Sequence, residues 1–443
     1  MKLLRSLYLR RRAFTAGWAV VLLLVGGYLW WPLFTVGKLA LLVLVLALLA
    51  DLWLLYRSPS GMQATRRTLE RWSNGDENPV SILLRSGYPM PVQVRVLDEL
   101  PVQFQRRDLV FEGALAPRGE RTFDHTVRPV ERGVYRYGAV NVFVRTALGL
   151  AERRFVLDRD REIAVYPAYL ELRKYELLAI SDRLTLAGIK RVRRVAQHAE
   201  FERVRDYVQG DDRRTVNWKA TARRGRLMVN QYQDEKAQQV VSLIDLGRVM
   251  KMPFRGLSLL DHAINASLVL SSIAMHKEDK AGLITFSDTV RDVLPPSRQR
   301  VQMRRILETL YAQDTDHRET DMEAVYGAVR RQLSQRSLLM LYSNFESLGA
   351  LRRQLPYLQR LARHHLVVVV FFLNTELDDD LKERAGDLGD VYRGTIARKY
   401  VHEKRLIVRE LERHGLIALL VRPEQLTVRV INEYLRIKAR GLI

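Results

Sequence analysis

Residues 201–235 read FERVRDYVQGDDRRTVNWKATARRGRLMVNQYQDE and divide the chain into two parts of different character. Two apolar runs and several strand-like segments precede this stretch, and apolar runs alternating with helical patterns follow it. Within the stretch, Gly210-Asp211-Asp212 predicts a sharp turn, because glycine tolerates positive φ and aspartate side chains bond nearby backbone groups. We therefore expect an ordered segment that organises the chain on either side of it.

The second half of this stretch combines an aromatic side chain with a cluster of arginines. Trp218 follows Asn217, and Arg223, Arg224 and Arg226 come shortly afterwards. Residues 190–226 contain twelve Lys and Arg against five Asp and Glu. The favoured interpretation is an ordered linker whose Trp218 packs on the next domain, since tryptophan buries a large apolar area. A docking surface for a partner protein is the alternative, and nucleic-acid binding is the least favoured one.

The same stretch resembles the signature of the family called "domain of unknown function 58". The residues that carry the resemblance are Arg205-Asp206-Tyr207, Gly210-Asp211-Asp212-Arg213, Asn217-Trp218, Ala222-Arg223 and Leu227-Met228-Val229. Members of this family are bacterial membrane proteins, often encoded beside MoxR-type AAA+ ATPases and proteins with von Willebrand factor A domains. The resemblance covers residues 201–250 directly. It implies a signature or docking role for Tyr207, Gly210, Asp211, Asp212, Arg213, Asn217, Trp218 and Arg223, but no established activity.

Length and composition bound the class of protein. A chain of 443 residues is long enough for two or three domains, and an apolar share of 47% supports a packed core. The net charge of +22 suits an anionic membrane surface or nucleic acid, and the apolar N-terminal runs favour the membrane. Because the chain has no cysteine, disulfides, thiolate zinc sites, iron–sulfur clusters and cysteine catalysis are excluded.

Residues 1–60 predict a cytoplasmic tail followed by a transmembrane hairpin with spans at 13–33 and 39–56. Each run can cross a hydrocarbon core of ~30 Å at a rise of ~1.5 Å per residue. A tight loop is expected from Pro32 to Lys38, and Trp30, Trp31, Trp53 and Tyr56 lie where an interfacial aromatic belt would be. A cleaved signal peptide is disfavoured, because the first run is too long and a second follows at once.

The charges beside the two runs predict their orientation. Basic residues precede the first run and follow the second, whereas only Lys38 lies in the expected loop. The positive-inside rule therefore places both termini and the soluble domains in the cytoplasm, on the inner membrane of a bacterium. Asp51 falls within about two turns of the cytoplasmic end, so we expect a hydrated interfacial carboxylate rather than a functional intramembrane one.

Between residues 75 and 160 the pattern changes to strands. Val92, Val94 and Val96 alternate with polar residues, and residues 140–144 repeat the pattern. Period-two alternation bounded by turn residues predicts half-buried antiparallel strands, and several of them predict a small β-sandwich that serves as an interaction or spacer module. Residues 161–237 are assigned to a linker that begins with a strand at 163–166, continues with a helix-like segment and carries the family signature.

Residues 238–443 predict a doubly wound α/β domain. Unbroken apolar runs alternate with helical patterns, which is typical of a parallel sheet covered on both faces. The expected strands are 240–246, 337–341, 366–373 and 416–421, and the expected helices are 257–277, 301–311, 322–332, 348–363 and 424–436. The arrangement resembles a von Willebrand factor A domain, as the family resemblance also implies.

Many von Willebrand factor A domains hold Mg²⁺ with an Asp-x-Ser-x-Ser loop, a later Thr and a later Asp, because Mg²⁺ needs six oxygens near octahedral geometry. Here Asp245 is kept, but Gly247 and Val249 replace the two hydroxyl residues. Thr320 fits the Thr position, and Asn344 stands where the second carboxylate is expected. We therefore expect no tight metal site from these degenerate residues, although water or Asp321 could complete weak Mg²⁺ binding.

The chain lacks the common motifs of phosphate loops, zinc proteases, serine hydrolases and dinucleotide-binding folds, so no cofactor and no catalytic residues are expected. The leading hypothesis is a non-enzymatic, membrane-anchored adaptor or scaffold. The resemblance implies a MoxR-type AAA+ ATPase as its partner and a role in envelope-linked protein remodelling or assembly. The alternative is a divalent-metal-dependent binding protein or hydrolase using Asp245, Thr320 and Asp321. Nucleic-acid binding is not expected.

Overall fold

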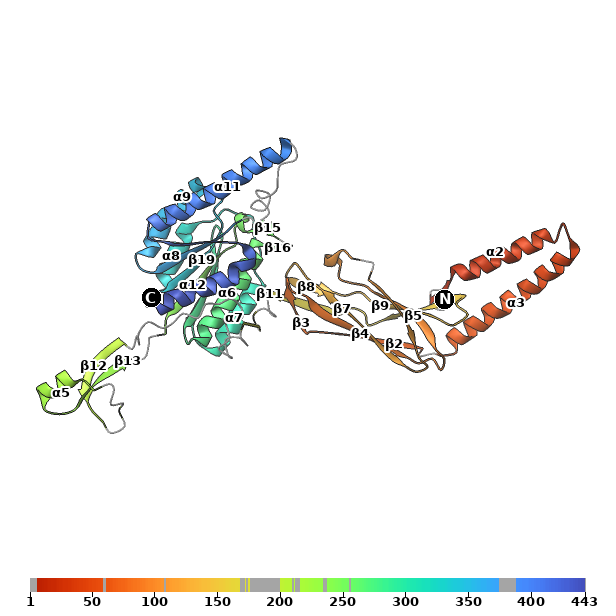
Figure 1. Cartoon of the computed structure of the whole chain (residues 1–443), viewed down its shortest axis with the longest axis horizontal. Coiled ribbons are helices and arrows are strands. Elements are labelled where there is room, and N and C mark those ends of the chain that lie inside the picture. The colour runs from red at the N-terminus through yellow and green to blue at the C-terminus, as the bar shows by residue number, and fades with distance from the viewer. Residues whose placement is uncertain are drawn as a thin grey trace. The chain divides into compact units, whose positions relative to one another are not determined.

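The computed structural model describes residues 6–58, 61–106, 109–167, 172, 174–175, 200–208, 211, 216–233, 237–254, 256–373 and 388–442. The chain divides into two compact units, Met1–Tyr166 and Pro167–Ile443 (Figure 1). The first unit carries two apolar helices and antiparallel sheets, and the second carries a small hairpin and a mixed α/β sheet. Each unit is described by itself below.

Helices α2 (Arg11–Gly26) and α3 (Trp31–Tyr56) lie side by side at the start of the first unit (Figure 1). Among the described residues, α3 is the one helix long and apolar enough to cross a membrane. The turn between the helices lies at residues 27–30, not at Pro32 to Lys38 as expected. Pro32 lies in the first turn of α3, where its missing N–H has no helical partner to lose and its fixed φ suits the helix.

Strands β1 to β11 form the rest of the first unit. A five-stranded antiparallel sheet has the order β1-β10-β9-β5-β6, and two three-stranded sheets have the orders β2-β4-β7 and β3-β11-β8. Their bounds are β1 (Leu7–Leu9), β2 (Met62–Thr68), β3 (Arg71–Asn74), β4 (Asn78–Ser86), β5 (Val92–Asp98), β6 (Val110–Leu115), β7 (Glu120–Val127), β8 (Gly133–Arg136), β9 (Val140–Arg145), β10 (Ala151–Leu157) and β11 (Glu162–Pro167).

The alternating valines form the core of this β module. Val94 and Val96 of β5 are buried and belong to one cluster with Ile82 and Leu84 of β4. The strands expected at 92–96, 140–144 and 163–166 are confirmed. The module is larger than the expected range of 75–160, because β2, β3 and β11 extend it and β1 joins it from before the helices.

The carboxyl end of α3 is built into the β module. Asp51 is fully buried, and its carboxylate accepts hydrogen bonds from the Thr146 hydroxyl and from the backbone N–H groups of Leu150 and Ala151, the latter two at 2.9 Å. One turn later, the Leu55 carbonyl accepts from the Tyr88 hydroxyl at 2.9 Å. The expectation of a hydrated carboxylate at Asp51 is wrong, because sheet backbone rather than water satisfies the side chain.

The second unit contains a hairpin that we name the α5 hairpin: strands β12 (Glu200–Asp206) and β13 (Met228–Gln233) with the short helix α5 (Trp218–Arg224) between them (Figure 1). Most of the helix-like segment expected before it lies outside the described residues. The strands pair antiparallel, so part of the expected linker is a folded element. The turn at Gly210 to Arg213 lies outside the described residues apart from Asp211.

The α/β region has a six-stranded sheet in the order β18-β17-β14-β19-β20-β21. All neighbours are parallel except β17 and β18. The strands are β14 (Gln239–Asp245), β17 (Lys280–Phe286), β18 (Val290–Ser297), β19 (Leu338–Tyr342), β20 (Leu366–Phe372) and β21 (Ile417–Val421). The helices are α6 (Leu259–His276), α7 (Arg300–Tyr311), α8 (Met322–Gln332), α9 (Leu348–Ala362), α11 (Leu388–Arg413) and α12 (Leu426–Ala439).

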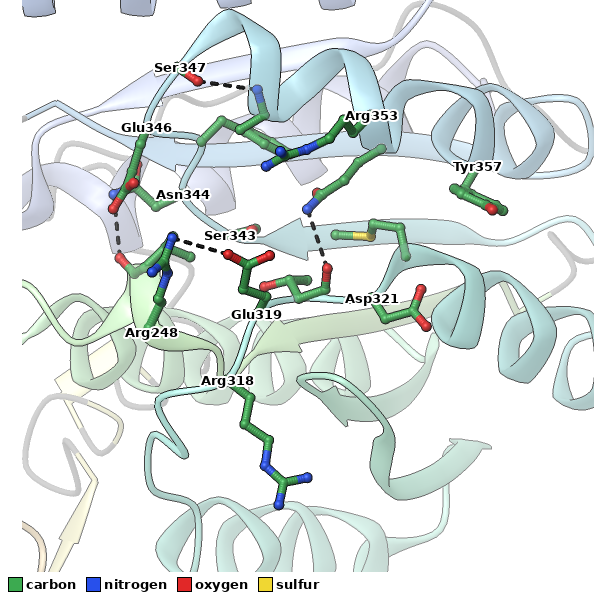
Figure 2. Close-up of a pocket in the computed structure, with 16 residues that line it drawn as sticks. Arg248, Arg318, Glu319, Asp321, Ser343, Asn344, Glu346, Ser347, Arg353 and Tyr357 are labelled. Atoms are coloured by element: carbon green, nitrogen blue, oxygen red, sulfur yellow. Dashed lines mark hydrogen bonds and ion pairs between the residues drawn. The ribbon is translucent and has the colours of Figure 1, made fainter.

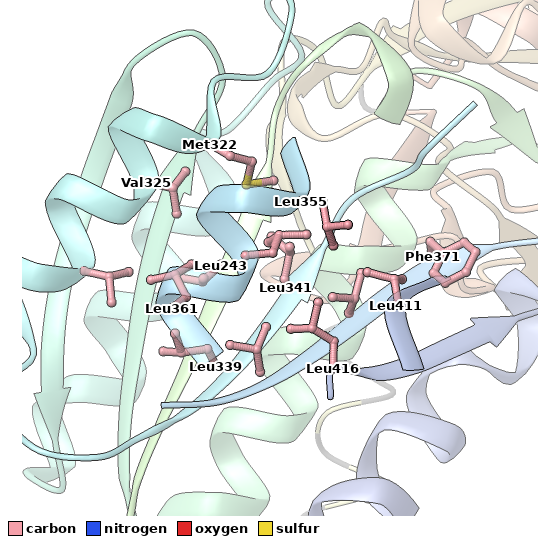
Figure 3. Close-up of a cluster of buried hydrophobic side chains, with 14 of the residues drawn as sticks. Leu243, Met322, Val325, Leu339, Leu341, Leu355, Leu361, Phe371, Leu411 and Leu416 are labelled. Atoms are coloured by element: carbon pink, nitrogen blue, oxygen red, sulfur yellow. The ribbon is translucent and has the colours of Figure 1, made fainter. Parts of the chain in front are cut away.

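The elements expected from apolar runs and helical periodicity are confirmed in this region. The sequence did not predict β17, β18 or α11, because the two strands carry charged or proline residues and α11 is rich in charge. One buried cluster joins the sheet to α8, α9 and α11, and it includes Leu243, Leu341 and Phe371 of three neighbouring strands (Figure 3). This core packs the helices against the strands, and the ends of those strands carry the side chains discussed next.

Candidate functional site

The strand order of the α/β sheet reverses between β14 and β19. In open α/β sheets, ligands bind outside the carboxyl ends of the strands at such a reversal. Asp245 ends β14, and Ser343 and Asn344 follow β19. A pocket of about 290 Å³ opens at this edge (Figure 2). Its charged lining residues are Arg248, Arg318, Arg353, Glu319, Asp321 and Glu346.

Asp245 is fully buried and bonds two residues of the pocket lining, Thr320 and Ser343. Its carboxylate accepts hydrogen bonds from the Gly247 N–H at 2.8 Å, from the Ser343 hydroxyl at 2.6 Å and from the Thr320 hydroxyl at 2.8 Å to each oxygen. Burial raises the pKa of Asp245, and the bonds from Ser343, Gly247 and Thr320 oppose that rise. Both carboxylate oxygens are therefore satisfied by protein donors.

Gly247 makes this arrangement sterically feasible. A Cβ at position 247 would lie 2.7 Å from the Thr320 hydroxyl oxygen and 3.0 Å from the Arg318 carbonyl oxygen. Both distances are shorter than ordinary van der Waals contact, and the carbonyl is backbone that cannot turn away. The site therefore requires a residue without a side chain where the resemblance leads one to expect serine.

The amide oxygen of Asn344, which the metal hypothesis needs as a ligand, is already bonded to a lysine. Its amide oxygen accepts a hydrogen bond of 2.6 Å from the ammonium of Lys404 in α11, which donates a second one of 2.6 Å to the Phe345 carbonyl. Lys404 is fully buried, and desolvation lowers its pKa to about 8 against the opposing effects of Glu346 and Glu403. A buried ammonium group therefore lies beside Asn344, the residue at the position where the resemblance leads one to expect a second carboxylate.

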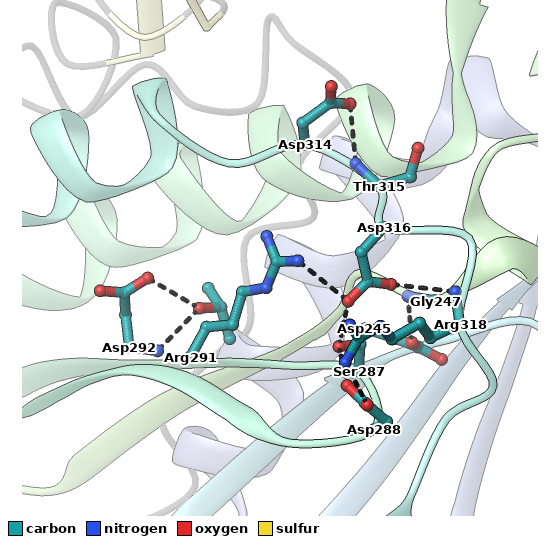
Figure 4. Close-up of polar contacts among 11 residues, drawn as sticks. Asp245, Gly247, Ser287, Asp288, Arg291, Asp292, Asp314, Thr315, Asp316 and Arg318 are labelled. Carbon is teal, nitrogen blue, oxygen red and sulfur yellow. Dashed lines mark hydrogen bonds and ion pairs between the residues drawn. The ribbon is translucent and has the colours of Figure 1, made fainter.

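A loop at residues 314–321 covers the end of β14 and carries its own polar network (Figure 4). Asp316 accepts hydrogen bonds from the Ser287 hydroxyl and from Arg291, the latter at 3.0 Å. Burial acts to raise the pKa of Asp316, but these bonds and the Arg318 N–H outweigh it and hold the pKa below its ordinary value. The Arg318 guanidinium binds Asp288 at 2.6 Å, which lowers the pKa of Asp288.

The residues at this edge do not fit a Mg²⁺ site. Positions 247 and 249 supply no side-chain oxygen, and Asn344 is held by the Lys404 ammonium. Among the described carboxylates, Asp245 is the one that accepts hydrogen bonds from Thr320 and Ser343. In the part of the chain that the structure describes, no group of three His, Cys, Asp or Glu side chains is placed to hold a metal ion. Octahedral coordination by six oxygens has no basis in these side chains.

Of the residues expected at the metal site, Asp245 and Thr320 are hydrogen-bonded to each other, whereas Asn344 is bonded to Lys404. Sequence reasoning missed two residues of this site, Ser343 and Lys404. Ser343 directly precedes Asn344, so its role could have been found by considering both residues after β19. Lys404 gives no such signal, because it lies 60 residues away in a charged helix.

The signature residues that the structure describes lie in the α5 hairpin. Asp211 accepts two hydrogen bonds from Arg205, at 2.8 and 2.7 Å. The Asn217 side chain caps α5 by accepting from the Ala220 N–H at 3.0 Å, and the Tyr207 N–H bonds the Leu227 carbonyl at 2.9 Å. These residues hold the hairpin together; Gly210, Asp212 and Arg213 lie outside the described residues.

The side chains of Trp218 and Arg223 face solvent, whereas those of Tyr207, Asp211 and Asn217 are partly buried. Trp218 is 71% exposed and Arg223 is exposed on the same short helix. The favoured interpretation, in which Trp218 packs as buried apolar mass, is wrong for this structure. A contact role for this surface is considered below.

Residues 203–388 match the family model described as "Protein of unknown function DUF58". A protein of Bacillus subtilis (strain 168), "Uncharacterized protein YeaD", is 26% identical over 230 residues, which make up 50% of this chain and 55% of that protein. The chain therefore spans about half the length of this curated relative.

Two solved structures align with parts of this chain. The conserved hypothetical protein BatB from Bacteroides thetaiotaomicron aligns over 46% of this chain and 100% of its own, with 13% identity and a TM-score of 0.33. The CARDB domain of the PF1109 protein from Pyrococcus furiosus aligns over 22% of this chain and 87% of its own, with 11% identity and a TM-score of 0.15. At these TM-scores neither likeness bears on function.

Proposed function

Because this chain belongs to the DUF58 family, whose model it matches over residues 203–388, we propose that it is a membrane-anchored adaptor rather than an enzyme. In this proposal α2 and α3 anchor the chain, and the edge of the α/β sheet beside Asp245 receives a partner protein. A MoxR-type AAA+ ATPase is the proposed partner, in envelope-linked protein remodelling or assembly. The α/β region is proposed to be a von Willebrand factor A-like domain, since its sheet has the doubly wound order.

The observation that carries the adaptor proposal is the saturation of Asp245. A catalytic or metal-binding carboxylate needs a free lone pair directed at its substrate or ion. Asp245 instead receives donors from Gly247, Thr320 and Ser343, and Arg248 in the pocket above pairs with Glu319 at 3.2 Å (Figure 2). A polar pocket in which the neighbouring carboxylate of Asp245 is saturated and Arg248 is paired suits recognition better than chemistry.

The anchor proposal is supported by the way both ends of the helical pair meet the β module. Before α2, strand β1 pairs with β10, and Arg10, the residue that directly precedes the helix, binds Glu152 at 2.9 Å. At the other end, Asp51 of α3 bonds Leu150 and Ala151. Because both ends meet the same strand region, the chain would enter and leave a membrane on one side. Residues 31–50, largely exposed, would span about 30 Å at ~1.5 Å per residue.

The proposed orientation of the chain in the membrane follows from the charges beside the two helices. Arg10, Arg11 and Arg12 lie at the start of α2, and Arg57 follows α3. The positive-inside rule favours the cytoplasmic face for these residues, and hence a two-pass anchor in the bacterial inner membrane with both termini and the soluble domains in the cytoplasm.

Crosslinking of the full chain in native membranes tests the partner. Arg353 lines the pocket and is exposed, and Arg305 of α7 is an exposed residue outside the pocket lining. We expect wild type and Arg305→Glu to recover a MoxR-type AAA+ ATPase and Arg353→Glu to recover much less of it. If no ATPase of this class is recovered by any of the three, the partner proposal is wrong. If Arg353→Glu recovers as much as wild type, the interface lies elsewhere.

Calorimetric titration with Mg²⁺ and Mn²⁺ distinguishes the adaptor proposal from the alternative, a metal-dependent binding protein or hydrolase. Binding at ~10–100 μM or tighter that disappears with Asp245→Ala would favour the alternative. We expect no such binding, since Asn344 is bonded to a buried ammonium.

A further inference from the structure

The α5 hairpin carries an exposed surface that its own fold does not explain. Trp218 is 71% exposed, Val208 61% and Leu227 46%. The segments that bear them are backbone neighbours, because the Tyr207 N–H bonds the Leu227 carbonyl and the Asn217 N–H bonds the Met228 carbonyl. Three exposed apolar side chains are thus gathered at one end of the hairpin.

The same end of the hairpin is strongly basic. From Asn217 to Gln233 the chain has four cations and no Asp or Glu. Two nearby carboxylates are already engaged, since Asp211 binds Arg205 and Asp206 lies 3.2 Å from Arg226. Lys219, Arg223 and Arg224 are exposed, and no carboxylate that the structure describes pairs with them. Beside the exposed tryptophan, the surface therefore presents three positive charges that no carboxylate among the described residues pairs with.

We propose that this surface, consisting of Trp218, Lys219, Ala222, Arg223, Arg224 and Leu227, docks on an anionic lipid membrane. Tryptophan favours the boundary between headgroups and hydrocarbon, where its ring is apolar and its N–H meets water. Lysine and arginine favour the negative surface potential of anionic lipids. Charge and apolar exposure coincide on one short helix, as a lipid surface requires.

An acidic protein segment would satisfy the charges but is less well matched. A protein partner ordinarily supplies a pocket that buries the tryptophan, with a rim of contacts around it. A membrane accepts a protruding ring without a matching cavity. The inference rests on the proposed function in one respect, because a chain anchored by α3 keeps the hairpin at high local concentration near lipid. Tethering strengthens a second, weaker contact without any new bond.

The absence of cysteine provides a direct test, since a single introduced thiol is the only one to label. Ala222 is exposed and lies one helical turn after Trp218. Full-length Ala222→Cys, labelled with a polarity-sensitive fluorophore, is reconstituted in phosphatidylglycerol or phosphatidylcholine vesicles that contain a nitroxide-lipid quencher. We expect blue-shifted, quenched emission in the anionic vesicles only.

Charge variants make the test specific. Each basic residue near an anionic surface strengthens membrane partitioning by a factor of about five, so Lys219→Gln/Arg223→Gln/Arg224→Gln should weaken docking by about 100-fold. Arg300→Gln/Arg304→Gln/Arg305→Gln removes the same charge from exposed positions of α7 and should leave the signal unchanged. If both triple variants weaken membrane docking equally, the proposal is wrong, because docking would then depend on the net charge of the chain and not on this surface.

Flotation of the same vesicles reports on the anchor separately. A chain that floats while the Ala222 probe stays in water on anionic lipid overturns the docking inference and leaves the anchor standing. A chain that does not float with phosphatidylcholine vesicles overturns the anchor, and the probe on phosphatidylglycerol vesicles still reports whether the hairpin binds the anionic surface. A probe that leaves water only when an acidic soluble protein is added assigns the surface to a protein and also overturns the inference.

Discussion

The ammonium of Lys404 donates a hydrogen bond of 2.6 Å to the amide oxygen of Asn344, so a helix late in the chain is tied to the end of the central strand β19. The same ammonium bonds the Phe345 carbonyl at 2.6 Å. This contact places a cation at the edge of the sheet where doubly wound folds bind ligands. It explains why Asn344 cannot act as a free ligand toward an ion above Asp245.

Lys404→Met should destabilise the α/β region. The substitution keeps the apolar stem but leaves the Asn344 oxygen and the Phe345 carbonyl without their donor, and each unsatisfied buried group costs about 1–3 kcal/mol. Lys399→Met, at an exposed position of the same helix, is the matched control. Denaturant unfolding of the full chain in detergent measures both. Equal midpoints for the two variants would mean that the contact contributes nothing to stability.

The pH dependence of stability should also report on Lys404. Its pKa falls from an ordinary 10.5 to about 8 in the fold, because burial disfavours the charged form. Between these values the unfolded chain binds more protons than the folded chain, so stability rises with pH in that window. We expect wild type to gain stability relative to Lys404→Met as the pH is raised from about 8 to about 10.5. Parallel curves for the two proteins would contradict this assignment.

Gly247→Ala should lower stability through a steric clash. The new methyl would lie 2.7 Å from the Thr320 hydroxyl oxygen and 2.9 Å from a carboxylate oxygen of Asp245, and overpacking of this kind costs about 1–3 kcal/mol. Gly394→Ala in α11 is the control, because a Cβ there meets nothing within 4 Å and alanine favours a helix interior. In thermal unfolding, we expect the melting temperature to fall for Gly247→Ala and to rise slightly for Gly394→Ala.

Asp51→Ala should loosen the join between α3 and the β module. It removes the acceptor for the N–H groups of Leu150 and Ala151, and hydrogen bonds to a charged group contribute about 1.5–3 kcal/mol each. Leu46→Ala, at an exposed position of the same helix, should have little effect on this join. Limited proteolysis in detergent, read at the 146–151 segment, should show faster cleavage for Asp51→Ala alone.

Trp218→Ala should leave folding stability nearly unchanged. The side chain is 71% exposed, and surface substitutions usually change stability by less than about 0.5 kcal/mol. Trp72→Ala is the contrasting variant, because Trp72 is fully buried among Tyr135 and Tyr137 and its loss should cost about 3–5 kcal/mol. Comparable losses in the two variants would show that Trp218 is packed after all.

Much of the architecture was predictable because it depends on local spacing. The alternation of Val92, Val94 and Val96 predicts a strand with one buried face, and the unbroken run at residues 366–373 predicts one buried on both. The candidate site was predictable only where the chain itself brings residues close. Asp245 and Gly247 lie two positions apart in one loop, so the sequence alone shows that a carboxylate is present there and that a hydroxyl ligand is missing.

The sequence by itself determined the apolar helix, the strand-rich module, the alternating α/β region and the loss of hydroxyls from the loop after β14, since residue type and period decide each of these. Only the tertiary structure decided that Asp51 bonds Leu150, that Lys404 holds Asn344, and that Trp218 faces solvent. The first two join residues 99 and 60 positions apart, and the third depends on what packs nearby. Burial and partners are properties of the packed chain, and no local pattern encodes them.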